Sequence, residues 1–135
     1  METIGNGAFI NGKFSSLSLG KGLREVGKSA FFCCKKLTTV TVPGNVTVVG
    51  NSAFRFCSAL SQITLKEGIE EIGGVAFADC PALTAVTIPK SVAAIGDKAF
   101  GYDFSGVSLG RTDLTIKGYT YTAAQYYAGE NGFPF

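Results

Sequence analysis

The chain has 135 residues, 12 of them basic, 10 acidic and none histidine, so its formal net charge is +2. This length predicts one domain, and a hydrophobic fraction of 46% excludes a disordered chain. The scattered charges predict no nucleic-acid partner, and the lack of histidine removes the usual general base and the commonest metal ligand. We therefore expect neither enzymatic activity nor a cofactor or metal.

A short pattern, Ile-Gly-x-x-Ala-Phe with Val in place of Ile in two copies, recurs along the whole chain. Its copies begin at Ile4, Val26, Val49, Ile72 and Ile95, so the later copies are evenly spaced and the first repeat is one position shorter. Each glycine must either adopt a positive φ or allow another backbone to approach closely, and it marks a corner of the repeat.

A second pattern follows the first at a fixed distance and predicts one strand per repeat. Its clear copies begin at Leu37, Leu60 and Leu83, and looser copies begin at Phe14 and Phe104. Apolar residues alternate with Thr or Ser in each copy, which is typical of a strand with one buried face. A repeat of this length that carries Leu-x-x-Leu-x-Leu predicts a leucine-rich repeat solenoid.

The expected fold is a β-rich α/β solenoid of about five 22–23-residue repeats. Each repeat forms one rung, with a parallel sheet on one face and short turns or 3-10 segments on the other. The repeated phenylalanines predict an interior aromatic column, whose members are Phe9, Phe31, Phe54, Phe77 and Phe100.

The cysteines recur with the same period and predict buried free thiols. Cys34, Cys57 and Cys80 each lie one repeat apart, whereas Cys33 lies outside the repeated position. Their spacing lacks the short pairs of a zinc site, and stacked parallel Cβ vectors fit a disulfide poorly.

The two ends of the array differ. Residues 1–118 are expected to form the solenoid and residues 119–135 a C-terminal capping segment, with both in a single domain. Thr122 and Gln125 predict a capping box and Gly132 a helix stop, and a tyrosine cluster is expected to pack the cap: Tyr119, Tyr121, Tyr126 and Tyr127. The first rung has no polar cap, so we expect either that the chain is a fragment of a longer repeat array or that it self-associates through this open N-terminal rung.

With these motifs the chain resembles the BspA-like leucine-rich repeats of bacterial and protozoan surface proteins, over nearly its whole length. The resemblance implies an extracellular or cell-surface location and binding to host matrix or cell-surface proteins. The alternative is a structural spacer that presents another domain and binds nothing itself. The longest uninterrupted apolar run covers only positions 30–34, so no transmembrane segment is predicted.

The candidate binding face is the outward side of the predicted sheet, where small polar side chains would form a flat recognition surface. Its residues are Ser18, Thr39, Thr41, Gln62, Thr64, Lys66 and Thr87. Ser108 would continue the row of hydroxyls. The alternative is that Thr and Ser simply suit exposed strand positions. The return side of the rungs, around Lys35, Arg55 and Asp79, is the next candidate.

One segment, residues 22–29, matches the phosphate-binding pattern Gly-x-x-x-x-Gly-Lys-Ser. That chemistry requires a glycine-rich loop between a buried strand and a long helix. The segment is instead one rung of the repeat, so a nucleotide site is not expected.

Overall fold

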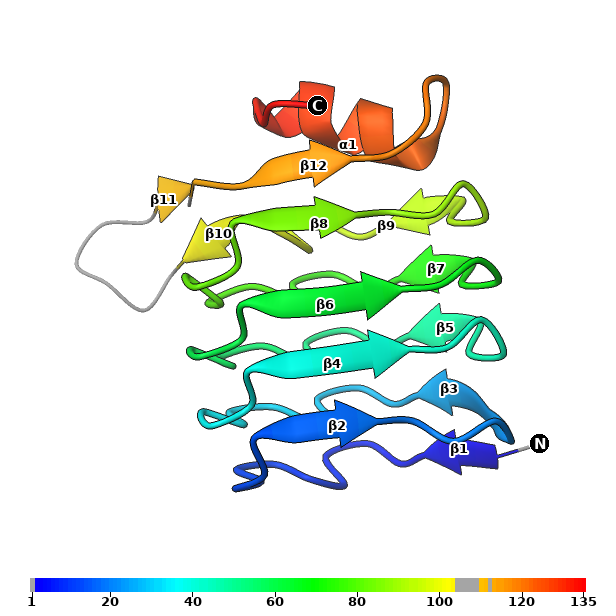
Figure 1. Ribbon diagram of the computed structural model, residues 1–135, viewed down its shortest axis with the longest axis vertical. Coiled ribbons are helices and arrows are strands. Elements are labelled where there is room, and N and C mark those ends of the chain that lie inside the picture. The colour runs from blue at the N-terminus through cyan, green and yellow to red at the C-terminus, as the bar shows by residue number, and fades with distance from the viewer. Residues whose placement is uncertain (1, 104–109, 112) are drawn as a thin grey trace.

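The computed structural model describes residues 2–103, 110–111 and 113–135, and the chain winds into a β-solenoid (Figure 1). One five-stranded parallel sheet contains β1 (Glu2–Ile4), β3 (Leu23–Val26), β5 (Val48–Val49), β7 (Glu71–Ile72) and β9 (Ala94–Ile95). Four turns of the solenoid separate these five strands. The fold class expected from the sequence is confirmed.

A second face carries the strands of the Leu-x-x-Leu-x-Leu pattern. A three-stranded parallel sheet contains β2 (Ser16–Ser18), β4 (Thr39–Val42) and β6 (Gln62–Leu65), and a two-stranded parallel sheet contains β8 (Ala85–Thr87) and β12 (Thr115–Lys117). Figure 1 shows these strands stacked on the near side, with β1, β3, β5, β7 and β9 behind them. An antiparallel pair, β10 (Tyr102–Asp103) with β11 (Gly110–Arg111), and helix α1 (Ala123–Asn131) complete the described elements.

The sequence did not predict the sheet formed by β1, β3, β5, β7 and β9. Its later strands are only two residues long, too short for an alternating pattern to be visible. They pair in register nevertheless, as Glu25 with Val48 and Val48 with Glu71. This sheet therefore joins all five rungs on one side of the solenoid.

The return turns form a further ladder through their main chain. Amides of the phenylalanine positions donate to carbonyls one rung further along, for example Phe31 N–H to Ala53 O at 2.8 Å and Phe54 N–H to Ala76 O at 2.8 Å. These bonds satisfy backbone groups that would otherwise be buried without a partner.

The predicted aromatic column is confirmed. Successive ring centroids from Phe9 to Phe100 lie 5.4, 5.1, 5.1 and 5.0 Å apart, with interplanar angles of 5–10°. Phe31, Phe54, Phe77 and Phe100 are fully buried, whereas Phe9 at the open end is 48% exposed. The column therefore forms the centre of the core.

The repeated glycines serve close backbone approach rather than positive φ. A Cβ on Gly50 would lie 2.8 Å from the Gly27 carbonyl carbon, and one on Gly96 would overlap the main chain of Gly74. Gly5, in the first rung, would meet nothing within 4 Å. The positive φ angles fall two residues later, at Gly7, Ser29, Ser52, Val75 and Lys98.

The strand next to β8 differs from the one expected. β12 pairs with β8 in register, Ile116 with Val86 and Lys117 with Thr87. The sequence predicted that the copy beginning at Phe104 would take this place, and that copy, like Ser108, lies within 104–109, outside the described residues. The step from Val86 to its neighbour Ile116 is longer than one repeat, because extra chain is inserted between these two strands.

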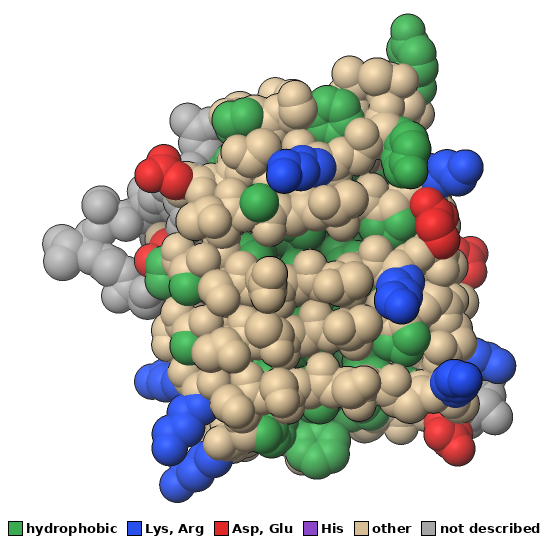
Figure 2. All heavy atoms as spheres, viewed as in Figure 1, with side chains coloured by type: hydrophobic (Ala, Val, Ile, Leu, Met, Phe, Trp, Pro, Cys, Tyr) green, Lys and Arg blue, Asp and Glu red, His purple; other side chains and the backbone are tan. Residues whose placement is uncertain are grey.

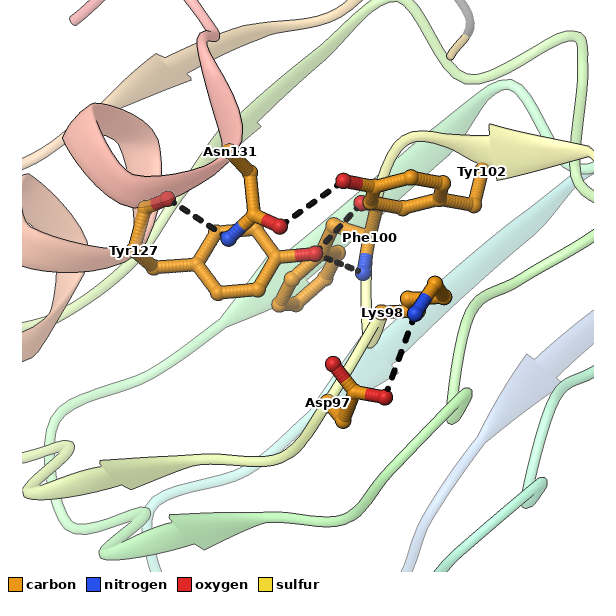
Figure 3. A network of polar contacts seen from close by, with 6 residues as sticks. All are labelled: Asp97, Lys98, Phe100, Tyr102, Tyr127 and Asn131. Carbon is orange, nitrogen blue, oxygen red and sulfur yellow. Dashed lines mark hydrogen bonds and ion pairs between the residues drawn. The ribbon is translucent and has the colours of Figure 1, made fainter. Parts of the chain in front are cut away.

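The C-terminal cap is built on Tyr127 (Figure 3). Its ring meets Phe100 edge-on at 6.1 Å, and its hydroxyl donates to Phe100 O at 2.6 Å and accepts from Phe100 N–H at 2.9 Å. Tyr102 and Asn131 extend this network, since the Tyr102 hydroxyl lies 2.8 Å from Asn131 Oδ1. Tyr127 thus ends the aromatic column.

Two expectations about the cap were wrong and one is confirmed. Three of the four tyrosines do not pack the cap but are exposed: Tyr119, Tyr121 and Tyr126. The capping box does not form, because the Thr122 hydroxyl donates back to Tyr119 O and Gln125 Oε1 accepts from Tyr121 N–H. Gly132 does end the helix, with φ 74° and Phe133 N–H bonded to Ala128 O.

All four cysteines are free thiols, as predicted. Cys34, Cys57 and Cys80 are buried, and each thiol lies 3.3 Å from the carbonyl of a phenylalanine in the preceding rung. Cys33 is only partly buried. Burial raises the pKa of Cys34 and Cys57, and it raises that of Cys80 to about 12.

Candidate functional site

The predicted binding residues that lie within strands share one outward side. The burial pattern along β4, β6 and β8 alternates, so that Val40, Leu65 and Val86 face the core while the residues between them are exposed or half-buried. We call this surface the hydroxyl face. It comprises Ser18, Thr39, Thr41, Gln62, Thr64 and Thr87 on the strands, with Lys66 directly after β6.

Strand register arranges the hydroxyl face in two rows. One row joins Ser18, Thr41 and Thr64 across β2, β4 and β6, and a second joins Thr39 to Gln62. The first row does not continue to Thr87 by ladder pairing, because the sheet ends at β6. Thr87 instead lies beside Lys117 of β12. The uniform ladder expected from the sequence is therefore interrupted.

The polar groups of the hydroxyl face are available to a partner. Within the described part of the chain, no side chain of this face makes a hydrogen bond to another part of the protein. The neighbouring hydroxyls are engaged, since Thr38 Oγ1 donates to Ser15 O at 3.0 Å and Ser61 Oγ donates to Thr38 O at 3.4 Å. Figure 2 shows a face of mostly uncharged side chains with charges gathered near its margins.

A groove of about 480 Å³ crosses the hydroxyl face where the two sheets meet. It is lined by Ser61, Gln62, Ile63, Thr84, Ala85, Val86, Thr87 and Lys117. In Figure 2 apolar side chains are visible between β6 and β8. Ile63 is half-buried beside this groove, whereas Val40, its register partner in β4, is 2% exposed.

Sequence reasoning missed Lys117 and Thr115, which belong to the same surface. Lys117 lines the groove beside Thr87, and Thr115 pairs with Ala85. The alternation of Leu114 and Ile116, both buried, was the available signal for a strand at this position. The repeat period does not predict this strand, because its distance from β8 departs from the period.

The return side offers less to a partner than expected. Arg55 Nε and Asp79 Oδ2 form an ion pair of 2.8 Å between adjacent rungs, and the Asp79 side chain is fully buried. The Arg55 guanidinium also lies 4.9 Å from the centroid of the Phe56 ring. Asp79 is therefore a structural residue, and of the three residues considered only Lys35 is exposed.

The segment that matches the phosphate-binding pattern, residues 22–29, has the wrong local structure for a nucleotide site. Its middle forms β3, and its glycine corner stacks on the rung before it, where Lys28 N–H donates to Asn6 Oδ1 at 2.9 Å. Ser29 is followed by a turn rather than by the helix that a nucleotide site requires. Among the described residues, no three His, Cys, Asp or Glu side chains are grouped to hold a metal ion. Nor does any helix in the described ranges have the length and apolar character to cross a membrane.

Comparison with protein families gives a match over most of the chain. Residues 1–105 match the BspA type leucine-rich repeat region, in six copies. No curated protein matches the sequence.

Several solved structures share the fold. The leucine-rich repeat protein of T. pallidum is 27% identical with a TM-score of 0.73, covering 84% of this chain and 50% of that one. A leucine-rich repeat protein from Bacteroides ovatus is 29% identical with a TM-score of 0.69, covering 87% and 28%. One from Bacteroides capillosus is 28% identical with a TM-score of 0.66, covering 78% of each chain. The chain thus spans half or less of the length of the first two.

Proposed function

The chain belongs to the BspA-type leucine-rich repeat family, and we propose that it is a non-enzymatic protein-binding domain that recognises its partner through the hydroxyl face. Repeat domains of this type are generally interaction modules rather than enzymes. The proposed partner is a host matrix or cell-surface protein. The proposed location is the cell surface or the extracellular space, by analogy with the surface proteins that the sequence resembles.

One observation carries this proposal. The hydroxyl face presents two rows of polar side chains that make no hydrogen bonds within the described chain, on strands held rigid from inside by the aromatic column. Such a surface has donors and acceptors fixed at the spacing of the strands, about 4.8 Å. A partner can bind them without first ordering loops, which lowers the entropy cost of association.

A binding assay on immobilised matrix proteins tests the proposal. Fibronectin, collagen and laminin serve as the panel, and the protein is compared with the variant Thr41→Glu, Thr64→Glu, Thr87→Glu. We expect the wild type to bind at least one panel member and the triple variant to lose that binding, because the three carboxylates oppose contact with the face. The corresponding triple Ala variant separates charge from loss of the hydroxyl groups.

Two results would count against the proposal. Binding that survives both triple variants, with the fold intact by circular dichroism, would place the contact elsewhere. Absence of binding to the whole panel and to intact host cells would favour a spacer that presents another domain.

We also propose that the isolated chain self-associates through its N-terminal end. That end opens into an apolar pocket of about 420 Å³, whose lining includes Phe9, Phe14, Leu17 and Phe31. Phe9 and Ile10 are 48% and 47% exposed. Exposed apolar surface next to unpaired strand edges favours contact with another copy.

A further inference from the structure

The rungs that contain β6 and β8 are joined on one side of the solenoid and separated on the other. Behind the hydroxyl face, β7 and β9 pair in register, Glu71 with Ala94 and Ile72 with Ile95. On the hydroxyl face, β6 ends one sheet and β8 begins another. The amides of Thr38, Ser61 and Thr115 each bond to the rung before, but Thr84 N–H makes no such bond among the described residues.

Side chains link these two rungs at the corner after the strands. Between the rungs of β4 and β6 the main chains touch, since a Cβ on Gly68 would overlap Gly44 O. Between the rungs of β6 and β8 the Glu67 carboxylate instead accepts from Lys90 N–H and Ser91 N–H, at 3.0 and 3.2 Å.

Because β6 and β8 do not pair, the main-chain groups on their facing edges point into the groove. In a parallel sheet the groups of successive residues point to alternate neighbours. Lys66 N–H bonds to Val42 O of β4, so the main chain of Leu65 and of Ile63 points away from β4. Ile88 N–H bonds to Lys117 O of β12, so the main chain of Thr87 points toward β6. Two unpaired strand edges therefore face each other across the groove.

The residues that line the groove indicate which kind of segment fits it. Ile63 and Ala85 supply apolar surface, and Gln62 and Thr87 supply side-chain donors and acceptors. Lys117 is the one charged residue in the lining. The hydrogen-bonding groups of an unpaired strand edge are matched best by another extended segment. The lining contains a lysine and no carboxylate, so it favours a segment with acidic side chains.

We propose that this groove holds an extended acidic segment of the partner protein, with its apolar side chains over Ile63 and Ala85 and a carboxylate near Lys117. The inference rests on the proposed function, because it places the recognition site within the hydroxyl face. It adds that the segment lies along the groove between β6 and β8, and that Lys117 binds its carboxylates.

A designed peptide is a suitable probe. An acetylated and amidated octapeptide of alternating Val and Asp is titrated into the ¹⁵N-labelled protein to about 1 mM, a concentration that detects weak binding. We expect saturable chemical-shift changes in β6, β8 and β12, and none in β3, β5 and β7. The same peptide with Lys in place of Asp should bind at least about ten-fold more weakly.

Two pairs of variants locate the site. Ala85→Tyr fills the groove from an exposed strand position and should weaken binding of the Val-Asp peptide about ten-fold. Ala94→Tyr, at an exposed position of β9 outside the hydroxyl face, should leave binding unchanged. Lys117→Glu should weaken binding similarly, and Lys66→Glu, outside the lining, should have a smaller effect. Thermal midpoints confirm that each variant is folded.

Three results would overturn the inference: no shifts at the highest peptide concentration, equal affinity for the Val-Lys peptide, or equal weakening by Ala85→Tyr and Ala94→Tyr. The matrix-protein assay separates this failure from failure of the proposed function. If Ala85→Tyr and Lys117→Glu retain full matrix-protein binding while the Thr→Glu triple variant loses it, the hydroxyl face binds and the groove is not the site.

Discussion

Phe54 has an aromatic neighbour on each side, Phe31 and Phe77, with both ring centroids 5.1 Å away, and it is fully buried. We expect Phe54→Ala to lower the free energy of unfolding by about 3–5 kcal/mol, because it opens a cavity that adjacent rungs cannot close. Denaturant unfolding measures this loss. Phe9→Ala, at the half-exposed end of the column, is the matched control and should cost much less. A loss below about 1 kcal/mol for Phe54→Ala would mean that this ring is not an interior residue.

The cysteines differ in burial, and their reactivity should follow. Burial raises the pKa of Cys80 to about 12 from an ordinary value of 9.0, so at pH 8 its thiol stays protonated and unreactive. Cys34 and Cys57 also have a raised pKa from burial, and both are enclosed. Iodoacetamide at pH 8 should therefore modify Cys33 alone in the folded protein, and all four cysteines after unfolding, as mass spectrometry can show.

The same shifts give the direction of a pH effect. Burial raises the pKa of these thiols in the folded state, whereas the same thiols ionise near pH 9.0 in the unfolded chain. The free energy of unfolding should therefore fall as the pH rises above 9. Rapid modification of Cys57 or Cys80 in the folded protein would contradict the interior position of the cysteine column.

At the scale of elements, the cap depends on one hydroxyl. Tyr127→Phe leaves the buried N–H and C=O of Phe100 without their partner, and this should cost about 1–3 kcal/mol of unfolding free energy. Tyr126→Phe is the matched control, because Tyr126 is 63% exposed on the same helix and should leave stability unchanged. Thermal or denaturant unfolding measures both. Equal stability of the two variants would show that the Tyr127 hydroxyl does not hold the cap.

Elements with a strict period could be predicted from the sequence. The strands β4, β6 and β8, the phenylalanine column and the cysteine column follow because side chains separated by one repeat must stack. The sequence also placed the helix stop at Gly132, where a left-handed residue without a Cβ is favourable.

Elements that depend on a break in the period could not be predicted. β12 joins β8 only after an insertion, so the spacing pointed to the wrong segment. The capping box failed because the Thr122 hydroxyl bonds to a carbonyl before the helix. The groove lies where β6 and β8 do not pair, and no local pattern in the sequence encodes that separation. The six predicted binding residues that lie on strands share one face because side chains alternate along each strand. Lys117 was missed because its strand, β12, does not follow the period.

At the scale of the whole molecule, the two ends of the solenoid differ in what they expose. The apolar N-terminal pocket should give reversible association that increases with concentration, measured by light scattering as a mass above 14.1 kDa. Ile10→Lys should shift the protein toward monomer, and Tyr121→Lys, at the opposite end and 87% exposed, should not. A strictly monomeric wild type at the highest soluble concentration would contradict this prediction.

The central claim is that recognition uses the hydroxyl face rather than the other two sides of the solenoid. Amide hydrogen exchange, measured with and without a bound matrix protein from the panel, tests it most directly. We predict slower exchange in the complex for peptides that contain β4, β6, β8 and β12, with unchanged exchange for those that contain β3, β5 and β7. Protection confined to β3, β5 and β7, or to the return turns around Lys35 and Arg55, would contradict it.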